Sequence, residues 1–124
     1  MGLFEFFTAL FEIFDPDVGK MLFRNDINGL IKALSYRKSR VRENAAWALG
    51  KTGDERAVEP LIRILNDSDV YVQYQAMESL VKIGEASVGP LIKSLTYEDP
   101  LVRSNSAAVL GNIGARQAVE PLIE

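Results

Sequence analysis

The stretch "VRENAAWALGKTG" at residues 41–53 recurs as "VRSNSAAVLGNIG" at residues 102–114, and a divergent copy, "VQYQAMESLVKIG", lies between them at residues 72–84. The leading valines of these copies are 31 and 30 residues apart. A second motif has the same period, since "LIKAL" at 30–34 returns as "LIRIL" at 61–65 and "LIKSL" at 91–95. Two motifs with one period indicate that the chain is built from structural repeats.

Each repeat has the pattern of two helices. In the second repeat the apolar residues Val58, Leu61, Ile62 and Leu65 follow the i, i+3, i+4, i+7 spacing of one helix face. Prolines at positions 60, 90 and 121 are expected in the first turn of this first helix, where a missing N–H is tolerated. The sequence therefore predicts a short amphipathic helix that starts each repeat.

A polar turn leads to the second helix of each repeat. Asp99 followed by Pro100 is typical of an N-cap and the first helical position. Gly53, Gly84 and Gly114 are expected to end the second helices in the left-handed conformation that glycine adopts easily. Because one helical hairpin cannot bury its own apolar face, we expect the hairpins to stack on one another.

The predicted fold is all-α, a right-handed α-solenoid of about three hairpins with an N-terminal apolar helical cap. We expect the cap over residues 1–25 and the repeats over residues 26–124, divided as 26–56, 57–87, 88–118 and a partial fourth repeat at 119–124. The incomplete fourth repeat would leave the flank of the third repeat uncovered. Association of identical chains through the ends therefore stays open.

The segment "VRENAAWALGKTGDERAVEPLI", Val41–Ile62, resembles the HEAT-like repeats of the phycobilin-lyase type. The resemblance covers about residues 26–124 and implies an α-solenoid in which Arg42 makes a structural hydrogen bond. That family mixes scaffolds, bilin lyases and a hydroxylase that binds iron through His-Glu pairs. This chain has no histidine, so we do not expect the hydroxylase activity. The second repeat departs from the pattern, with Gln73 in place of the usual arginine and Val81 in place of glycine.

The composition narrows the chemistry that the side chains can perform. The chain has 14 basic and 17 acidic residues, which argues against a general nucleic-acid binder. It has no cysteine and no histidine, and so lacks thiol nucleophiles, thiolate metal ligands and the commonest general base. The acidic residues fall mainly at helix caps or on exposed helix faces. We therefore predict a non-enzymatic protein without a cofactor or metal.

The resemblance places the second helix of each hairpin on the concave side of the solenoid. Its outward positions differ among the repeats, whereas its inward positions are similar, as expected for a binding surface. Trp47 is the first candidate anchor, because tryptophan and tyrosine are frequent in binding hot spots; the alternative is that it packs on a neighbouring helix. The candidate partner-binding residues are Glu43, Asn44, Trp47, Lys51, Tyr74, Gln75, Glu78, Lys82, Ser104, Asn105 and Asn112.

The N-terminal segment is rich in phenylalanine. Three roles are open for this segment: a cap on the first repeat, a contact with a second copy, or a helix in a membrane interface. Residues 2–14 contain two glutamates and no Lys or Arg, which argues against binding to an anionic membrane. The residues assigned to capping or self-association are Phe4, Phe7, Phe11 and Phe14.

The leading functional hypothesis is a scaffold that binds another protein through the concave face of the second helices. Two alternatives remain: an accessory factor in chromophore or cofactor attachment, resembling the bilin lyases, and a membrane-peripheral adaptor that uses the N-terminal helix. The start of the chain lacks the basic region of an export signal, and no apolar run reaches transmembrane length. We therefore expect a cytoplasmic protein, with neither nucleic acid nor membrane as its partner.

Overall fold

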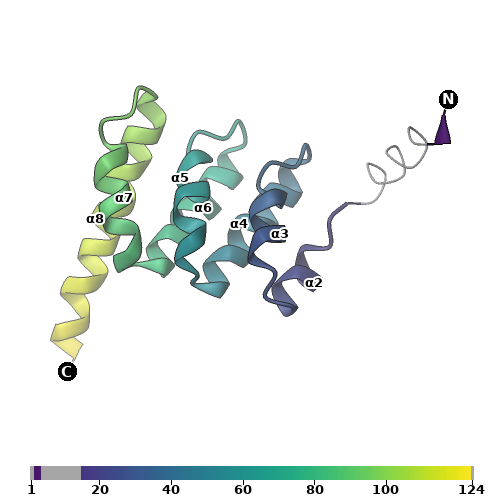
Figure 1. The fold of residues 1–124 in the computed structure, drawn as a ribbon. Helices are drawn as coiled ribbons and strands as arrows, with labels where there is room; N and C mark the ends of the chain where they lie inside the picture. The colour runs from purple at the N-terminus through teal and green to yellow at the C-terminus, as the bar shows by residue number, and fades with distance from the viewer. Residues whose placement is uncertain (1, 4–14, 124) are drawn as a thin grey trace.

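The computed structural model describes residues 2–3 and 15–123, with side chains to residue 117. Over these residues the structure contains helices and no strand, which confirms the predicted all-α fold (Figure 1). The elements are α2 (Val18–Phe23), α3 (Ile27–Ala33), α4 (Ser39–Thr52), the 3-10 turn η1 (Glu55–Ala57), α5 (Val58–Arg63), α6 (Val70–Ile83), α7 (Glu85–Ser94) and α8 (Pro100–Ile123).

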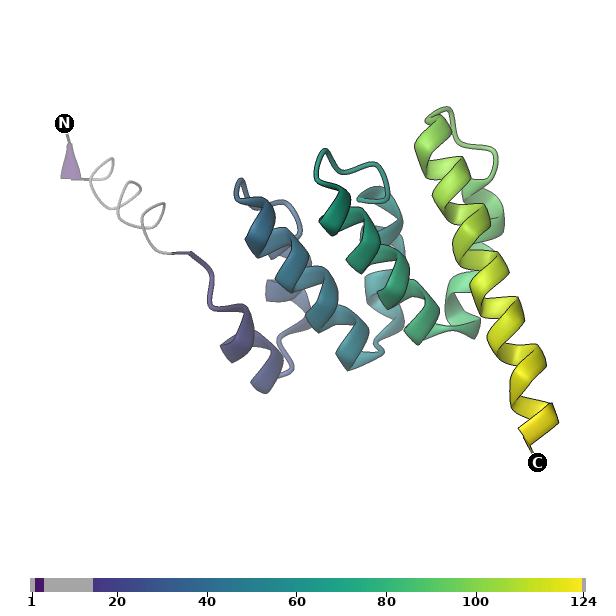
Figure 2. The same cartoon turned by 180° about the vertical axis from the view of Figure 1, so that it is seen from behind.

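The helices form two layers. Helices α3, α5 and α7 lie in front in Figure 1, and helices α4, α6 and α8 come forward when the molecule is seen from behind in Figure 2. The hairpins α3/α4, α5/α6 and α7/α8 lie side by side in chain order, with α2 against the first hairpin. This arrangement confirms the predicted α-solenoid, because each hairpin covers the face of its neighbour.

The two repeated sequence motifs supply one continuous core. The leading leucines of the first helices, Leu30, Leu61 and Leu91, are fully buried. Burial of each such side chain contributes about 1.5–3 kcal/mol to folding. The leading valines at positions 41, 72 and 102 of the second helices are buried as well. The repeat is therefore conserved within the chain at the positions that hold the hairpins together.

The second helix of the third repeat begins as predicted. The Asp99 carboxylate accepts a hydrogen bond from the Leu101 N–H at 2.9 Å, and α8 starts at Pro100. Gly53 and Gly84 have φ angles of 67° and 74° and follow the last residues of α4 and α6. Gly53 has the predicted left-handed conformation, whereas Gly84 differs from the prediction with a ψ angle of −123°. Only glycine adopts these angles without a steric cost from a β-carbon, which explains its place at these helix ends.

Gly114 does not end its helix, so that prediction is wrong. Helix α8 continues from Pro100 through Gly114 to Ile123. After Gly53 and Gly84 the chain turns back into a first helix that packs in the core, whereas residues 115–123 prolong α8 past the other helices (Figure 2). A glycine inside a helix costs only about 1 kcal/mol relative to alanine, so local propensity does not force a break there. Residues 119–123 therefore form no separate first helix.

The position of Pro90 also differs from the prediction. Pro60 lies in the first turn of α5 as expected, but Pro90 is the sixth residue of α7. The reason is the connection: Gly84 alone separates α6 from α7, and α7 therefore starts at Glu85. The Ser87 hydroxyl donates a hydrogen bond of 3.0 Å to the Leu80 carbonyl and so satisfies a group at the end of α6.

Small residues let α4 and α6 approach closely. A β-carbon built on Gly50 would lie 2.8 Å from the Cβ of Ser79 and 3.0 Å from its Cα, closer than real contacts allow. The Ser79 hydroxyl is buried and donates a hydrogen bond to the carbonyl of Ala46. Glycine at position 50 is therefore required by the helix contact and not by a turn.

The phenylalanines at positions 4, 7, 11 and 14 lie outside the described residues, so their predicted capping or self-association role stays a prediction. Among the helices that the structure describes, none combines the length and hydrophobicity needed to cross a bilayer.

Candidate protein-interaction surface

Trp47 and Tyr74 are exposed aromatic residues on neighbouring helices of one layer. Trp47 on α4 leaves 40% of its surface exposed, and Tyr74 on α6 leaves 57% exposed. The ammonium of Lys51 lies 5.6 Å from the centre of the Trp47 ring, a cation–π contact one turn along α4. This contact fixes the ring against its own helix and leaves part of its apolar surface in contact with solvent.

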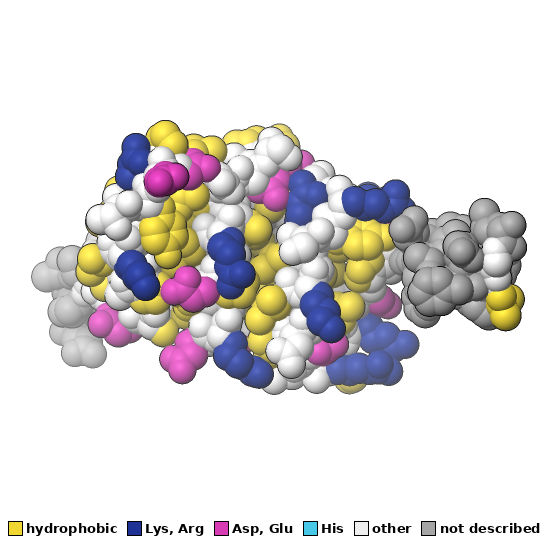
Figure 3. Space-filling model, turned by 45° about the horizontal axis from the view of Figure 1, so that its top comes forward, with side chains coloured by type: hydrophobic (Ala, Val, Ile, Leu, Met, Phe, Trp, Pro, Cys, Tyr) yellow, Lys and Arg dark blue, Asp and Glu magenta, His cyan; other side chains and the backbone are white. Residues whose placement is uncertain are grey.

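The remaining candidate residues divide by exposure. The exposed ones belong to all three second helices. The exposed residues are Asn44, Lys51, Lys82, Ser104 and Asn112, and the half-buried residues are Glu43, Gln75, Glu78 and Asn105. Figure 3 shows the side of α3, α5 and α7 with the top of the molecule brought forward, and on that face hydrophobic side chains lie among Lys or Arg and Asp or Glu side chains.

Asn105 contacts the preceding repeat. Its side-chain amide donates a hydrogen bond of 2.7 Å to the Leu65 carbonyl and lies 3.4 Å from the Gln73 side-chain oxygen. Gln73 in turn donates to the Asp67 carbonyl at 2.6 Å. The amide of Asn105 therefore forms a hydrogen bond to the second repeat, whereas the side chain of Asn44 is exposed to solvent.

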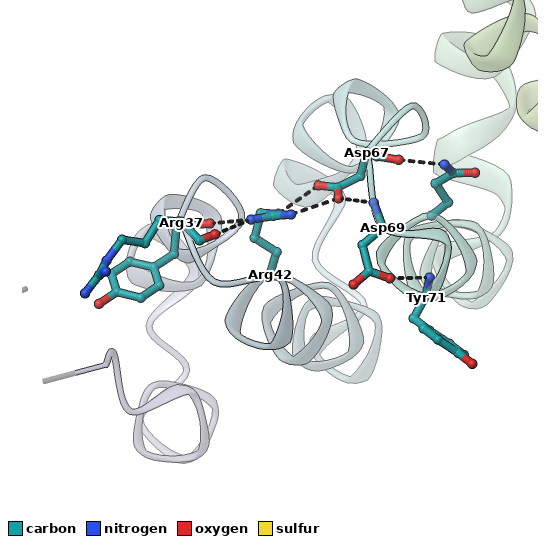
Figure 4. Close-up of polar contacts among 7 residues, drawn as sticks. Arg37, Arg42, Asp67, Asp69 and Tyr71 are labelled. Carbon is teal, nitrogen blue, oxygen red and sulfur yellow. Dashed lines mark hydrogen bonds and ion pairs between the residues drawn. The ribbon is translucent and has the colours of Figure 1, made fainter. Parts of the chain in front are cut away.

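Arg42 joins the first repeat to the second through an ion pair (Figure 4). Its Nε and Nη2 atoms donate to the two carboxylate oxygens of Asp67 at 2.8 and 3.0 Å. Its Nη1 atom donates to the carbonyls of Tyr36 and Arg37 at 2.8 and 3.0 Å. The hydrogen bonds that Arg42 donates to Asp67 hold the pKa of Arg42 above its ordinary value.

The resemblance indicated a structural hydrogen bond for Arg42, but sequence reasoning missed Asp67 as its partner. Asp67 was expected among the acidic residues at helix caps, and the other two repeats have Tyr36 and Tyr97 at the same position. Asp69, two residues later, caps α6 by accepting from the Tyr71 N–H at 2.8 Å. This bond and one from Ser39 lower the pKa of the Asp69 carboxyl.

A cavity of about 240 Å³ lies where α6, α7 and α8 meet. Its polar rim includes a hydrogen bond of 2.8 Å from the Gln117 amide to the Glu85 carboxylate. In the part of the chain with described side chains, no three acidic residues gather as a metal site would require. The cavity is lined by Val81, Lys82, Gly84, Glu85, Ile113, Arg116 and Gln117.

Comparison with known proteins identifies relatives with the same kind of repeat. The chain is 33% identical over 121 residues to a phycocyanobilin lyase subunit alpha of a Picosynechococcus strain, covering 79% of this chain and 45% of the relative. It is 36% identical over 118 residues to the subunit of the same name from a Nostoc strain, covering 79% of this chain and 42% of the relative. The chain thus spans less than half the length of these relatives.

A third relative is the deoxyhypusine hydroxylase of Schizosaccharomyces pombe, which is 32% identical over 77 residues, with 60% of this chain and 24% of that protein covered. The names of these relatives are names of enzymes, and they contradict the prediction that the chain is non-enzymatic. That prediction was wrong because missing histidine and cysteine limit only the chemistry of this chain's own side chains. The absence of these residues does not exclude that the chain acts as one subunit of an enzyme with several subunits.

The family comparison agrees with the architecture. A model of HEAT repeats matches residues 20–80 and 58–124, which together include every helix from α3 to α8. The expected resemblance is confirmed, as is a scaffold of helical repeats. The chain belongs to the family of HEAT repeat proteins.

Proposed function

We propose that this HEAT-repeat scaffold binds a partner protein through the outward face of α4, α6 and α8, with Trp47 and Tyr74 as anchors. The exposure of both aromatic side chains on neighbouring helices carries the proposal. Exposed aromatic side chains become favourable when a partner removes them from water, and they dominate many interfaces. The expected compartment is the cytoplasm.

Charged residues around the anchors support recognition of a protein. Lys51 and Lys82 are exposed on this face, and Glu43 and Glu78 are half-buried beside them. Such mixed charge at a rim contributes to orientation and specificity more than to affinity. It does not have the large basic excess that a nucleic-acid backbone requires.

A second candidate function is a subunit that takes part in bilin attachment. The names of the two lyase subunits favour it, since both relatives cover 79% of this chain. In this proposal the same face positions a partner protein while phycocyanobilin is handled by the assembled complex. Incubation of the chain with phycocyanobilin, alone and with candidate acceptor proteins, tests it through the absorbance of the bound bilin.

The scaffold proposal is tested by parallel capture with three baits: the unchanged chain, Trp47→Ala and Phe23→Ala. Phe23 is the control, because it is an aromatic residue that is 91% exposed and lies on α2, not on the three helices of the proposed face. The proposal expects a partner that the unchanged chain and Phe23→Ala retain and Trp47→Ala loses. Equal recovery by all three baits contradicts it.

Binding can then be measured directly with the purified partner. Trp47 is the only tryptophan of the chain, so its fluorescence reports on this face without a label. A blue shift on titration, absent when the partner is added to Trp47→Ala, is expected if the ring becomes buried. Thermal unfolding of Trp47→Ala confirms beforehand that the variant is folded.

A further inference from the structure

The cavity where α6, α7 and α8 meet has a cause in the sequence. Gly50 of the first repeat and Val81 of the second repeat occupy the same position of the repeat pattern. Gly50 lets Ser79 of the next hairpin approach so closely that a β-carbon on the glycine would lie 3.0 Å from the Ser79 Cα. Val81 carries a branched side chain at that position and lines the cavity together with Ile113 of α8. Helices α6 and α8 are accordingly less closely packed than α4 and α6.

The continuation of α8 supplies a second side of the cavity. After Gly53 the chain turns back into the core, whereas α8 continues past Gly114 and brings Arg116 and Gln117 to the start of α7 (Figure 2). The Gln117 amide donates a hydrogen bond of 2.8 Å to the carboxylate of Glu85, the first residue of α7. Three helices thus surround a volume of about 240 Å³.

The lining of the cavity combines apolar and cationic side chains. Val81 and Ile113 supply hydrocarbon surface, and the ammonium of Lys82 and the guanidinium of Arg116 supply positive charge. Neither cation forms an ion pair or a hydrogen bond with the residues that the structure describes. The carboxylate of Glu85 is hydrogen-bonded to a neutral amide and to neither cation. Both cations are therefore available to a ligand.

The charge and the size of the cavity define a class of ligand. Lys82 and Arg116 carry two positive charges and Glu85 carries one negative charge, so the lining matches a monoanion better than a polyphosphate. The planar fork of an arginine fits the two oxygens of a carboxylate. The apolar walls favour a hydrocarbon part in the ligand. That part must be small, because pockets for drug-sized molecules have volumes of roughly 300–1,000 Å³.

We propose that this cavity binds a small organic monocarboxylate. Its carboxylate lies between Lys82 and Arg116, and its hydrocarbon part packs on Val81 and Ile113. A ligand in this position contacts both α6 and α8, and so fixes the position of the third repeat relative to the second.

The site is separate from the aromatic anchors of the proposed partner-binding face. Lys82 belongs to both sets of residues, but Trp47 and Tyr74 do not line the cavity. The proposal therefore does not depend on the binding of a partner protein, and the two can fail independently.

Titration of the isotope-labelled chain with model acids, followed by NMR, tests the site. The probes are hexanoate and phenylacetate, and the controls are hexanamide and phenylacetamide, which have the same shape without the charge. The proposal expects saturable shifts of the amide signals of Gly84, Ile113 and Arg116 with the acids and not with the neutral amides. No saturable shift with either acid, or equal shifts with the neutral amides, overturns it.

Charge variants identify the groups that hold the carboxylate. Lys82→Gln and Arg116→Gln are each expected to weaken binding of the acids by roughly tenfold, because each change removes a charged hydrogen-bond donor. Lys93→Gln is the matched control, since Lys93 is exposed on α7 and does not line the cavity. Unchanged affinity in both cavity variants, or an equal loss in Lys93→Gln, overturns the assignment.

A change of cavity volume gives an independent test. Val81→Phe places a ring in the space that the ligand is proposed to occupy, and is expected to abolish the shifts at Ile113 and Arg116. Thermal unfolding checks that this variant is folded, and the charge variants decide the question if it is not. Binding by folded Val81→Phe with the affinity of the unchanged chain would contradict the proposed position of the ligand.

Inorganic phosphate and adenosine monophosphate test the choice of a carboxylate. The proposal expects both to bind more weakly than hexanoate at the same amide signals. Tighter binding of either phosphate would overturn the assignment to a carboxylate. Shifts spread evenly over the exposed Lys and Arg residues of the chain would show a general effect of charge, and would overturn the site itself.

Discussion

The guanidinium of Arg42 on α4 and the carboxylate of Asp67 before α6 face one another in a two-pronged ion pair, with N–O distances of 2.8 and 3.0 Å (Figure 4). Their side chains are only 15% and 9% exposed. Paired charges in a partly buried site must both be present, because either one alone is left without its counter-charge. This pair therefore fixes the register between the first two hairpins.

Replacing Asp67 by alanine is expected to lower the free energy of unfolding by roughly 1–3 kcal/mol, because Arg42 then loses two charged hydrogen bonds. Urea denaturation measures the change. Arg56→Ala is the control, since it removes a surface ion pair with Asp54 and leaves the backbone hydrogen bond of Asp54 in place. Equal losses in the two variants would contradict a special role for the Arg42–Asp67 pair.

Two glycines at the same repeat position are expected to respond in opposite directions to alanine. Gly50→Ala places a methyl group against Ser79 and should destabilise the protein by about 1–3 kcal/mol. Gly111→Ala meets open space and should stabilise α8 by up to about 1 kcal/mol. Thermal and urea unfolding of both variants check the signs. Ser79→Gly in the Gly50→Ala background should recover part of the loss.

The buried leucines of the first helices set the stacking. Leu61→Ala should cost roughly 2–5 kcal/mol, because Leu61 is fully buried between hairpins. Leu101→Ala is the matched control, with a side chain that is 40% exposed. A loss below about 1 kcal/mol for Leu61→Ala in chemical denaturation would contradict the packing seen here.

The free energy of unfolding is expected to fall at acidic pH, because the carboxylates that cap helices become protonated. The side-chain hydrogen bond from Asn66 and the N–H of Leu101 lower the pKa of Asp99 in the folded protein. A lowered folded pKa means that the stabilisation is present above the unfolded pKa of about 4 and is lost as pH falls through the folded pKa.

Asp99→Asn tests this pH dependence. The amide can still accept a hydrogen bond at the helix start but does not titrate, so unfolding midpoints measured from pH 6 to pH 2 should depend less on pH than those of the unchanged chain. The same dependence in both proteins would show that Asp99 contributes nothing to the acid response.

The repeat period and the helix caps could be predicted because they depend on local pattern. Leu61, Asp99 and Gly53 were each assigned the role that the structure shows. Gly114 was misassigned, since the same glycine motif ends a helix only where the following segment folds back onto the core. The start of α7 determines where Pro90 lies in that helix. It depends on a one-residue connection between α6 and α7, and helix propensities do not specify the geometry of such a connection.

The candidate surface could be predicted in part from the sequence. Helical spacing placed Trp47 and Tyr74 outward, and both are exposed. It did not distinguish Asn105 from Asn44, because the hydrogen bond from Asn105 to Leu65 depends on how successive hairpins pack. For the same reason the sequence could not pair Arg42 with Asp67, 25 residues away.

The measurement that tests the central claim most directly is site-specific photo-crosslinking in a native extract. A photo-reactive phenylalanine analogue replaces Trp47, Tyr74 or the control residue Phe23, which is 91% exposed on α2, in separate preparations. Partner binding through the face of α4 and α6 predicts the same crosslinked protein from positions 47 and 74 and none from position 23. No adduct at positions 47 and 74, or equal adducts at all three positions, contradicts it.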